Sequence, residues 1–157
     1  MKKPRIVVFT AIAGLLATTV VVAQRPSPDQ MAVGFRQAVM TVMAGTAGPL
    51  GQMTRGRMPY DAAAVSKASG RLTVLAGFVP DAFAHDTRAA SGVKTEALPL
   101  IWMNHAEFLM RANDLQMRAD ELATAVKDGN EDAIKTAMKN VGTTCGACHD
   151  KFRKSDK

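Results

Sequence analysis

Residues 130–152 of the chain read NEDAIKTAMKNVGTTCGACHDKF. Apolar side chains recur there at steps of three and four, which predicts one amphipathic helix. Asn130 is a good N-cap, and the acids that follow it suit the positive end of the helix dipole. The apolar stripe continues through two cysteines: its members are Ile134, Ala137, Met138, Val141, Cys145, Cys148 and Phe152.

The segment Cys145-Gly146-Ala147-Cys148-His149 is the attachment pattern of a c-type haem. Its two thiols can form thioethers with the two vinyl groups of the porphyrin, and the adjacent imidazole can bind the iron. On a helix these three residues share one side. The motif therefore predicts one covalent haem c, tethered by Cys145 and Cys148, with His149 as the metal ligand.

Other uses of these cysteines fit less well. A redox C-x-x-C pair normally opens a helix after a strand, and no strand pattern precedes this one. A structural zinc site needs four ligands, and only His85 and His105, in distant segments, could complete it. Plain structural cysteines stay open as an alternative. The two histidines are also candidate iron ligands, although surface positions suit them better.

A first helix is predicted upstream, beginning at the capping sequence Ser27-Pro28-Asp29-Gln30. It should run to about Thr46, where a stretch rich in glycine, with Pro49, weakens, bends or ends it. Any continuation should end near Gly56.

Two more helices lie between the first and the last. One opens at Pro59-Tyr60-Asp61 and should be closed by Pro80. A loop over residues 81–99 follows, and the next helix begins near Leu100 or Asn104 and ends at Gly129. Four amphipathic helices with mostly short connections predict an all-α fold, an antiparallel four-helix bundle with a covalently bound haem.

Residues 1–23 have the pattern of a secretory signal peptide: a basic start, an uncharged run and a small-residue cleavage site before Gln24. The alternative is that the run stays as a membrane anchor. Either way the domain, residues 24–157, is exported, and for a bacterial chain the compartment is the periplasm. Of 20 basic residues against 14 acidic ones, the leader removes three basic ones, leaving +3, too mild a charge to argue for nucleic-acid binding.

The first helix offers one face to the opposite side of a haem, carrying Arg36, Met40, Met43 and Ala47. Either methionine could be a thioether ligand, or both could simply pack against the ring. Arg36 is either a buried partner of the haem propionates or a surface residue. Arg153, one turn beyond His149, is either a donor beside the imidazole or part of a basic helix end.

Taken together, these residues resemble the class II c-type cytochromes, specifically the cytochrome c′ family. The resemblance covers essentially residues 24–157 and includes Phe35-Arg36-Gln37-Ala38-Val39-Met40, Pro59-Tyr60-Asp61, Ile101-Trp102 and the C-terminal C-x-x-C-H followed by Asp150-Lys151-Phe152-Arg153. It implies a five-coordinate, high-spin haem whose distal face is blocked by an apolar side chain, here Met40.

The resemblance also implies the neighbours of the haem. Arg36 and Gln37 should lie near a propionate, Arg153 beside the proximal pocket, and Glu96, with Thr95, at the haem edge. It further implies NO and CO binding and a homodimer formed through the first two helices. The sequence itself shows no decisive apolar patch on the outer faces of those helices.

Three functions remain in competition. The first is a cytochrome that exchanges electrons with redox partner proteins and binds NO or CO. The second is a low-spin electron carrier with Met40 or Met43 as sixth ligand. The third is a haem enzyme such as a weak peroxidase, which would need a polar distal group that moves protons. The first helix offers no histidine for that role, so no catalytic residue is expected.

Overall fold

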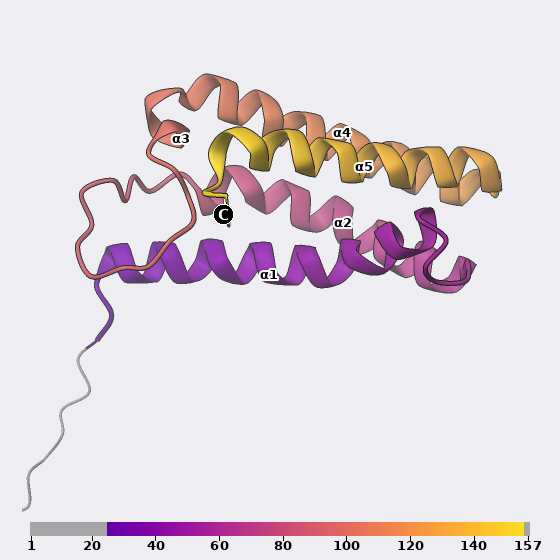
Figure 1. Cartoon of the computed structure of the whole chain (residues 1–157), viewed down its shortest axis with the longest axis horizontal. Helices are drawn as coiled ribbons and strands as arrows, with labels where there is room; N and C mark the ends of the chain where they lie inside the picture. The colour runs from indigo at the N-terminus through magenta and orange to yellow at the C-terminus, as the bar shows by residue number, and fades with distance from the viewer. Residues whose placement is uncertain (1–24, 156–157) are drawn as a thin grey trace, which may run out of the picture.

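The computed structural model describes residues 25–155, which fold into an antiparallel four-helix bundle (Figure 1). The bundle helices are α1 (Pro28–Thr54), α2 (Ala62–Ala82), α4 (His105–Asp128) and α5 (Glu131–Phe152), and α3 (Leu100–Met103) is a single turn before α4. This confirms the predicted fold class. The predicted signal peptide, residues 1–23, lies outside the described residues.

The core is built from the apolar stripes of all four long helices. Its largest fully buried side chains are Val65, Leu72, Ile101, Phe108, Leu122 and Val141. Burying one such side chain contributes about 1.5–3 kcal/mol. The stripe of α5 behaves as predicted: its aliphatic members and Phe152 are buried, and its two cysteines pack against the same core.

Helix α1 takes the longer of its two predicted courses. It passes through Pro49 and ends at Thr54, just before Gly56 adopts a φ of +66°. Leu50, one residue after the proline, is buried in the core. The burial of that side chain favours the continuation, although Pro49 cannot donate a helical hydrogen bond.

The expectation that Pro80 closes the second helix is wrong by two residues. Helix α2 continues to Ala82, and the backbone N–H of Phe83 then bonds back to the carbonyl of Pro80. Because Val79, Ala82 and Phe83 are all buried, the last turn is held against the core beyond the proline.

The segment between α2 and α3, residues 83–99, closes one end of the bundle (Figure 1). Its first residue is joined to α3, which follows it, because the Trp102 indole N–H donates to the carbonyl of Phe83 at 3.0 Å. Its last part pairs with the end of α5: Leu98 N–H donates to Phe152 O at 3.0 Å and Lys154 N–H to Glu96 O at 2.8 Å. We call residues 83–99 the strap.

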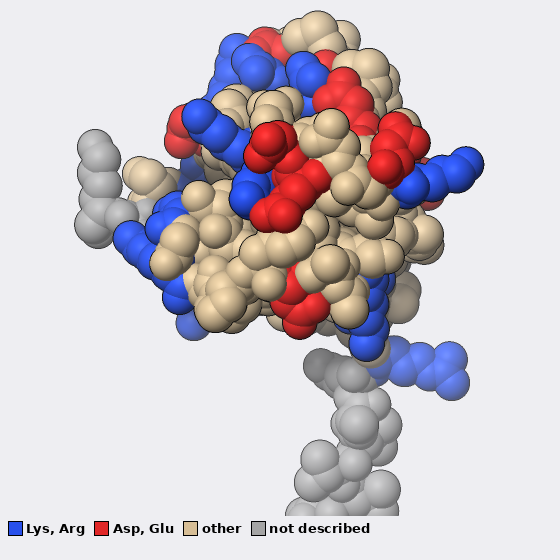
Figure 2. All heavy atoms as spheres, turned by 90° about the vertical axis from the view of Figure 1, so that its right-hand side faces the viewer, with Lys and Arg blue, Asp and Glu red and all other residues tan. Residues whose placement is uncertain are grey.

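The opposite end of the bundle carries the α1–α2 and α4–α5 connections. Figure 2 shows that basic and acidic side chains are interspersed on this face. Within residues 25–155, no helix is both long enough and apolar enough to cross a membrane.

The cap of α5 should contribute measurably to stability. The Asn130 side chain accepts a hydrogen bond from Ala133 N–H at 3.0 Å. We expect Asn130→Ala to cost about 1 kcal/mol and to lower the melting temperature by roughly 4 °C in thermal unfolding followed by circular dichroism. Asn130→Ser keeps a capping oxygen and is the control; an unchanged melting temperature in the alanine variant would show that the cap is not stabilising.

Candidate haem site

The three residues of the attachment motif lie in the last turns of α5, and its two cysteines pack against the core. Cys145 and Cys148 are half-buried free thiols, and the His149 side chain beside them is exposed. Burial raises the pKa of both thiols, with the neighbouring Cys145 adding to the effect on Cys148. Burial lowers the pKa of His149, helped by the nearby Arg153. The imidazole is therefore biased towards its neutral form, which is the form that binds a metal.

Helix α1 carries the predicted opposite face. Arg36 and Met43 are buried, while Met40 and Ala47 are half-buried and pack against the core. The four residues thus share the inner side of α1, as their spacing predicted. Helix α1 packs less extensively against α5 than against α2.

Two glycines accompany the motif on α5. A Cβ atom placed on Gly142 or on Gly146 would meet nothing within 4 Å. Gly146 lies inside the motif and Gly142 lies one turn before it. Two unpaired thiols three residues apart, followed directly by an imidazole, are the set of groups that a covalently attached porphyrin needs.

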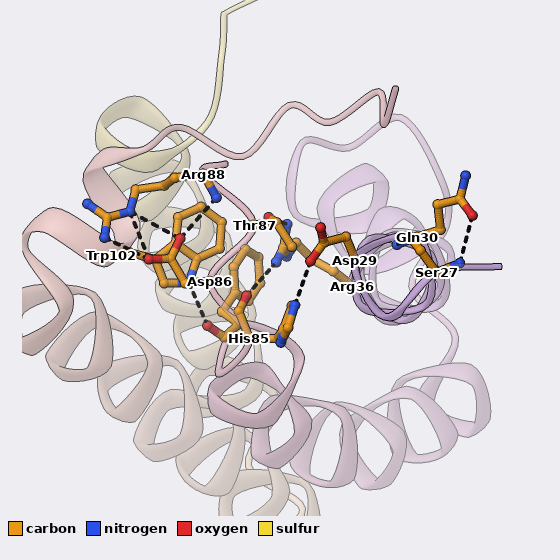
Figure 3. A network of polar contacts seen from close by, with 10 residues as sticks. Ser27, Asp29, Gln30, Arg36, His85, Asp86, Thr87, Arg88 and Trp102 are labelled. Atoms are coloured by element: carbon orange, nitrogen blue, oxygen red, sulfur yellow. Dashed lines mark hydrogen bonds and ion pairs between the residues drawn. The ribbon is translucent and has the colours of Figure 1, made fainter. Parts of the chain in front are cut away.

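The guanidinium of Arg36 is held by the strap and by the end of α2 (Figure 3). Its Nε donates to Ala82 O at 3.3 Å, its Nη1 to Thr87 Oγ1 at 3.2 Å and its Nη2 to His85 O at 3.4 Å. Its Cζ also lies 4.7 Å from the ring centre of Phe83 and 4.9 Å from that of Trp102. The guanidinium is therefore fixed in both position and orientation.

Every partner of this guanidinium is neutral. Arg36 is only 3% exposed, and among residues 25–155 no carboxylate lies within ion-pair distance of it. Burial lowers the pKa of Arg36, but an arginine keeps its charge in a folded protein. A buried charge of this kind fits an anionic group supplied from outside the chain, such as a haem propionate.

The other predicted site residues gather where the strap runs between α1 and α5. Gln37 is exposed and donates from Nε2 to the carbonyl of Lys94 at 2.9 Å. The Thr95 hydroxyl accepts from Ala97 N–H at 3.2 Å, and the backbone carbonyl of Glu96 accepts from Lys154. Arg153 is the C-cap of α5 and forms an isolated antiparallel bridge with Ala97. The structure therefore brings all four to one end of the bundle.

The two remaining histidines lie on other elements, His85 in the strap and His105 at the start of α4. His85 is exposed, and its Nε2 lies 2.7 Å from Asp29 Oδ1 in α1. His105 is half-buried rather than at the surface, and its ring stacks on Phe108 at 6.1 Å between centres. Within the described part of the chain, no cluster of three or more His, Cys, Asp or Glu residues could hold a metal ion, so neither histidine joins the cysteines in a zinc site.

Sequence reasoning missed three residues around Arg36. Thr87, Phe83 and Trp102 contact its guanidinium, and Thr87 is only 6% exposed. A threonine in a polar loop gives no local signal of burial. Only the apolar pair Ile101-Trp102 marked this region in the sequence.

Comparison with known sequences gives a consistent result. The family model described as Cytochrome C′ matches residues 31–153. A cytochrome c-554 of Cereibacter sphaeroides is 32% identical over 123 residues, covering 77% of this chain and 79% of the relative. A cytochrome c′ of Rubrivivax gelatinosus is 32% identical over 122 residues, covering 78% of this chain and 93% of the relative.

Solved structures agree with this result. The crystal structure of cytochrome c′ from Rubrivivax gelatinosus superposes with a TM-score of 0.72 at 30% identity, covering 83% of this chain and all (100%) of that one. The nitric oxide complex of a mutant cytochrome c prime from Alcaligenes xylosoxidans gives a TM-score of 0.70 at 30% identity, covering 84% of this chain and 100% of that one. With the attachment motif on its last helix and a bundle of this shape, the chain belongs to the cytochrome c′ family and is a c-type cytochrome that carries one covalent haem c.

Proposed function

We propose that this protein is a periplasmic mono-haem cytochrome that exchanges electrons with redox partner proteins and binds NO or CO at a five-coordinate iron. The observation that supports the proposal is that the two thiols on α5, next to His149, and the apolar Met40 and Met43 on α1 pack against the same core. The nitric oxide complex of the relative from Alcaligenes xylosoxidans supports the choice of gas.

In this proposal each residue has a defined task. Cys145 and Cys148 tether the porphyrin, and the His149 imidazole binds the iron from the α5 side. Bound haem supplies an iron that alternates between ferric and ferrous states and can take up a small gas on an open axial face. Met40 restricts access to that face from the α1 side, because its side chain packs there against the core.

The polar residues hold the edge of the ring. Arg36 and Gln37 stand on α1 near a propionate, and Glu96 with Thr95 approach the ring from the strap. Arg153 lies one turn beyond His149 and influences the imidazole, whose pKa it lowers. The proposal includes no catalytic residue: Arg36 keeps its proton at all accessible pH values, and a thioether cannot act as an acid or base.

We also propose a homodimer. An apolar surface that the sequence pattern did not reveal covers the outside of α1 and α2, and its members are Met31, Phe35, Val42, Val74 and Phe78. Each is between 44% and 62% exposed, and the rings of Phe35 and Phe78 meet edge to face at 6.4 Å. Exposed apolar side chains gathered on two neighbouring helices are typical of an interface. We call it the α1/α2 apolar surface.

Export rests on the leader pattern of residues 1–23. Thioether attachment of haem requires two reduced cysteines, and this chain has only the two of the motif. A membrane-anchored form and the cleaved form can be told apart by whether the protein sediments with membranes.

Covalent haem at the motif is the first prediction to test. When the protein is produced with a haem-attachment system and then denatured, its mass should exceed that of the cleaved polypeptide by one haem. His149→Ala should keep the added mass but lose the native absorption spectrum, because the thioethers do not need the imidazole. A native spectrum in that variant would reject His149 as the iron ligand.

Gas access should depend on Met40. We expect Met40→Ala to raise the affinity for CO by at least about tenfold, or about 1.4 kcal/mol, because the side chain that restricts the distal face is shortened. Optical titration of the ferrous protein measures this. Met53→Ala, a half-buried methionine at the far end of α1, is the control.

The same spectra decide the sixth ligand. A broad ferrous Soret band without a sharp alpha band agrees with the five-coordinate site. A sharp alpha band that is lost in Met40→Ala or Met43→Ala would instead establish the low-spin electron carrier. An unchanged CO affinity in Met40→Ala would show that Met40 does not restrict access to the distal face.

The dimer should depend on the α1/α2 apolar surface. We expect Val74→Glu to convert a dimer to a monomer in sedimentation velocity, because a carboxylate in an apolar interface loses its hydration. Met110→Glu places the same charge at a similarly exposed position (54%) on α4 and should leave the dimer intact. A parent protein that sediments as a monomer at all concentrations would contradict the proposal.

A further inference from the structure

The orientation of the Arg36 guanidinium is set mostly by backbone. Two of its three hydrogen bonds go to the carbonyls of Ala82 and His85, which any side chain at those positions would provide. The third goes to the hydroxyl oxygen of Thr87 at 3.2 Å, which is the only hydrogen bond from Arg36 to a side chain among the described residues (Figure 3). Thr87 is therefore the position at which the sequence controls this contact.

Thr87 is itself firmly placed. It is 6% exposed within a loop whose neighbouring residues are mostly exposed, and its backbone carbonyl accepts from Ala90 N–H at 3.1 Å. The two residues that flank it in the sequence, Asp86 and Arg88, form an ion pair with each other, with Arg88 Nη2 2.7 Å from Asp86 Oδ2. The local turn thus holds the Thr87 hydroxyl at Arg36 without recruiting either of the neighbouring charged side chains.

The three hydrogen bonds of Arg36 do not use all the N–H groups of its guanidinium. A guanidinium has five N–H groups: one on Nε and two on each terminal nitrogen. The hydrogen bonds found in the described part of the chain use one on each nitrogen, which leaves one on Nη1 and one on Nη2. Two N–H groups on neighbouring terminal nitrogens suit the two oxygens of a carboxylate.

We propose that Thr87 is a positioning residue of the haem site: its hydroxyl fixes the guanidinium of Arg36 so that the two remaining N–H groups face a haem propionate. This rests on the proposed function. Thr87 does not touch the haem; it acts through Arg36.

Loss of the Thr87 hydroxyl should shift the redox equilibrium of the haem iron. Without Thr87 Oγ1, one buried N–H of Arg36 loses its acceptor, and the guanidinium turns to find another. A positive charge near the haem destabilises the ferric state relative to the ferrous state. When the guanidinium moves away from the propionate, this destabilisation becomes weaker. We therefore expect the ferrous-to-ferric ratio of Thr87→Val at a fixed electrode potential to fall by roughly threefold. A change of this size corresponds to part of the free energy of a hydrogen bond to a charged group.

The experiment compares matched variants of the holoprotein by spectroelectrochemistry. Thr87→Val removes the hydroxyl at nearly constant volume, and Thr87→Ser restores it and should restore the ratio. Thr46→Val is the control, because Thr46 is also buried, at 8% exposure, but bonds within its own helix to Val42 O at 2.8 Å. If Thr87→Val does not fold, Thr87→Ala, which also lacks the hydroxyl, carries the same expectation.

Two further measurements separate positioning from general destabilisation. In an Arg36→Met background Thr87→Val should cause no additional change in the ratio, because the effect passes through the guanidinium. Solvent exchange of the Arg36 Nε–H, followed by NMR in the diamagnetic ferrous CO form, should be faster in Thr87→Val and normal in Thr87→Ser. A ratio that matches that of Thr46→Val, or that Thr87→Ser does not restore, overturns the proposal.

Failure of the proposed function looks different. A denatured parent protein without the mass of a haem would reject the cytochrome itself. The Arg36 Nε–H exchange rates of parent and Thr87→Val, measured in that haem-free chain, would then still decide whether Thr87 holds Arg36. Equal rates would overturn the positioning role independently of the haem.

Discussion

One face of α5 both closes the hydrophobic core and carries the two cysteines of the attachment motif. The stripe of α5 that closes the core with Ile134, Val141 and Phe152 also carries Cys145 and Cys148. The helical period forces this sharing, because residues at steps of three and four from Ile134 to Phe152 all lie on one side. A group tethered to these thiols is therefore placed between α5 and the helices that pack against it, and the site cannot be separated from the core.

The two sides of the site are tied together by the strap as well as by direct packing. Helix α1 packs less against α5 than against α2. The strap bonds to α1 through Arg36 and Gln37, and its other end pairs with the last turn of α5 through Glu96 and Leu98. Hydrogen bonds to the strap thus fix the two helices relative to each other at one end of the bundle.

What the sequence could predict followed from local rules. The caps at Ser27 and Asn130, the stripe of α5 and the attachment motif each depend on residues within a few turns of one another. Pro80 failed as a stop signal because burial of Ala82 and Phe83 outweighed a local preference. The contact between Arg36 and Thr87 joins residues 51 positions apart, so no periodicity could reveal it. The α1/α2 apolar surface stayed hidden because exposed and buried apolar residues alternate along both helices.

The buried charge of Arg36 connects the cofactor to folding. Carbonyl dipoles and the faces of Phe83 and Trp102 stabilise a guanidinium only in part, so its burial without an anion remains costly. The thiols lie on an apolar face of α5, and the cation stands on α1 beside the strap. A ligand with an apolar body and carboxylates at one edge satisfies both environments, whereas an apolar ligand or a simple anion satisfies only one. The placement of Arg36 thus favours a porphyrin held in one orientation, with its propionates at the strap.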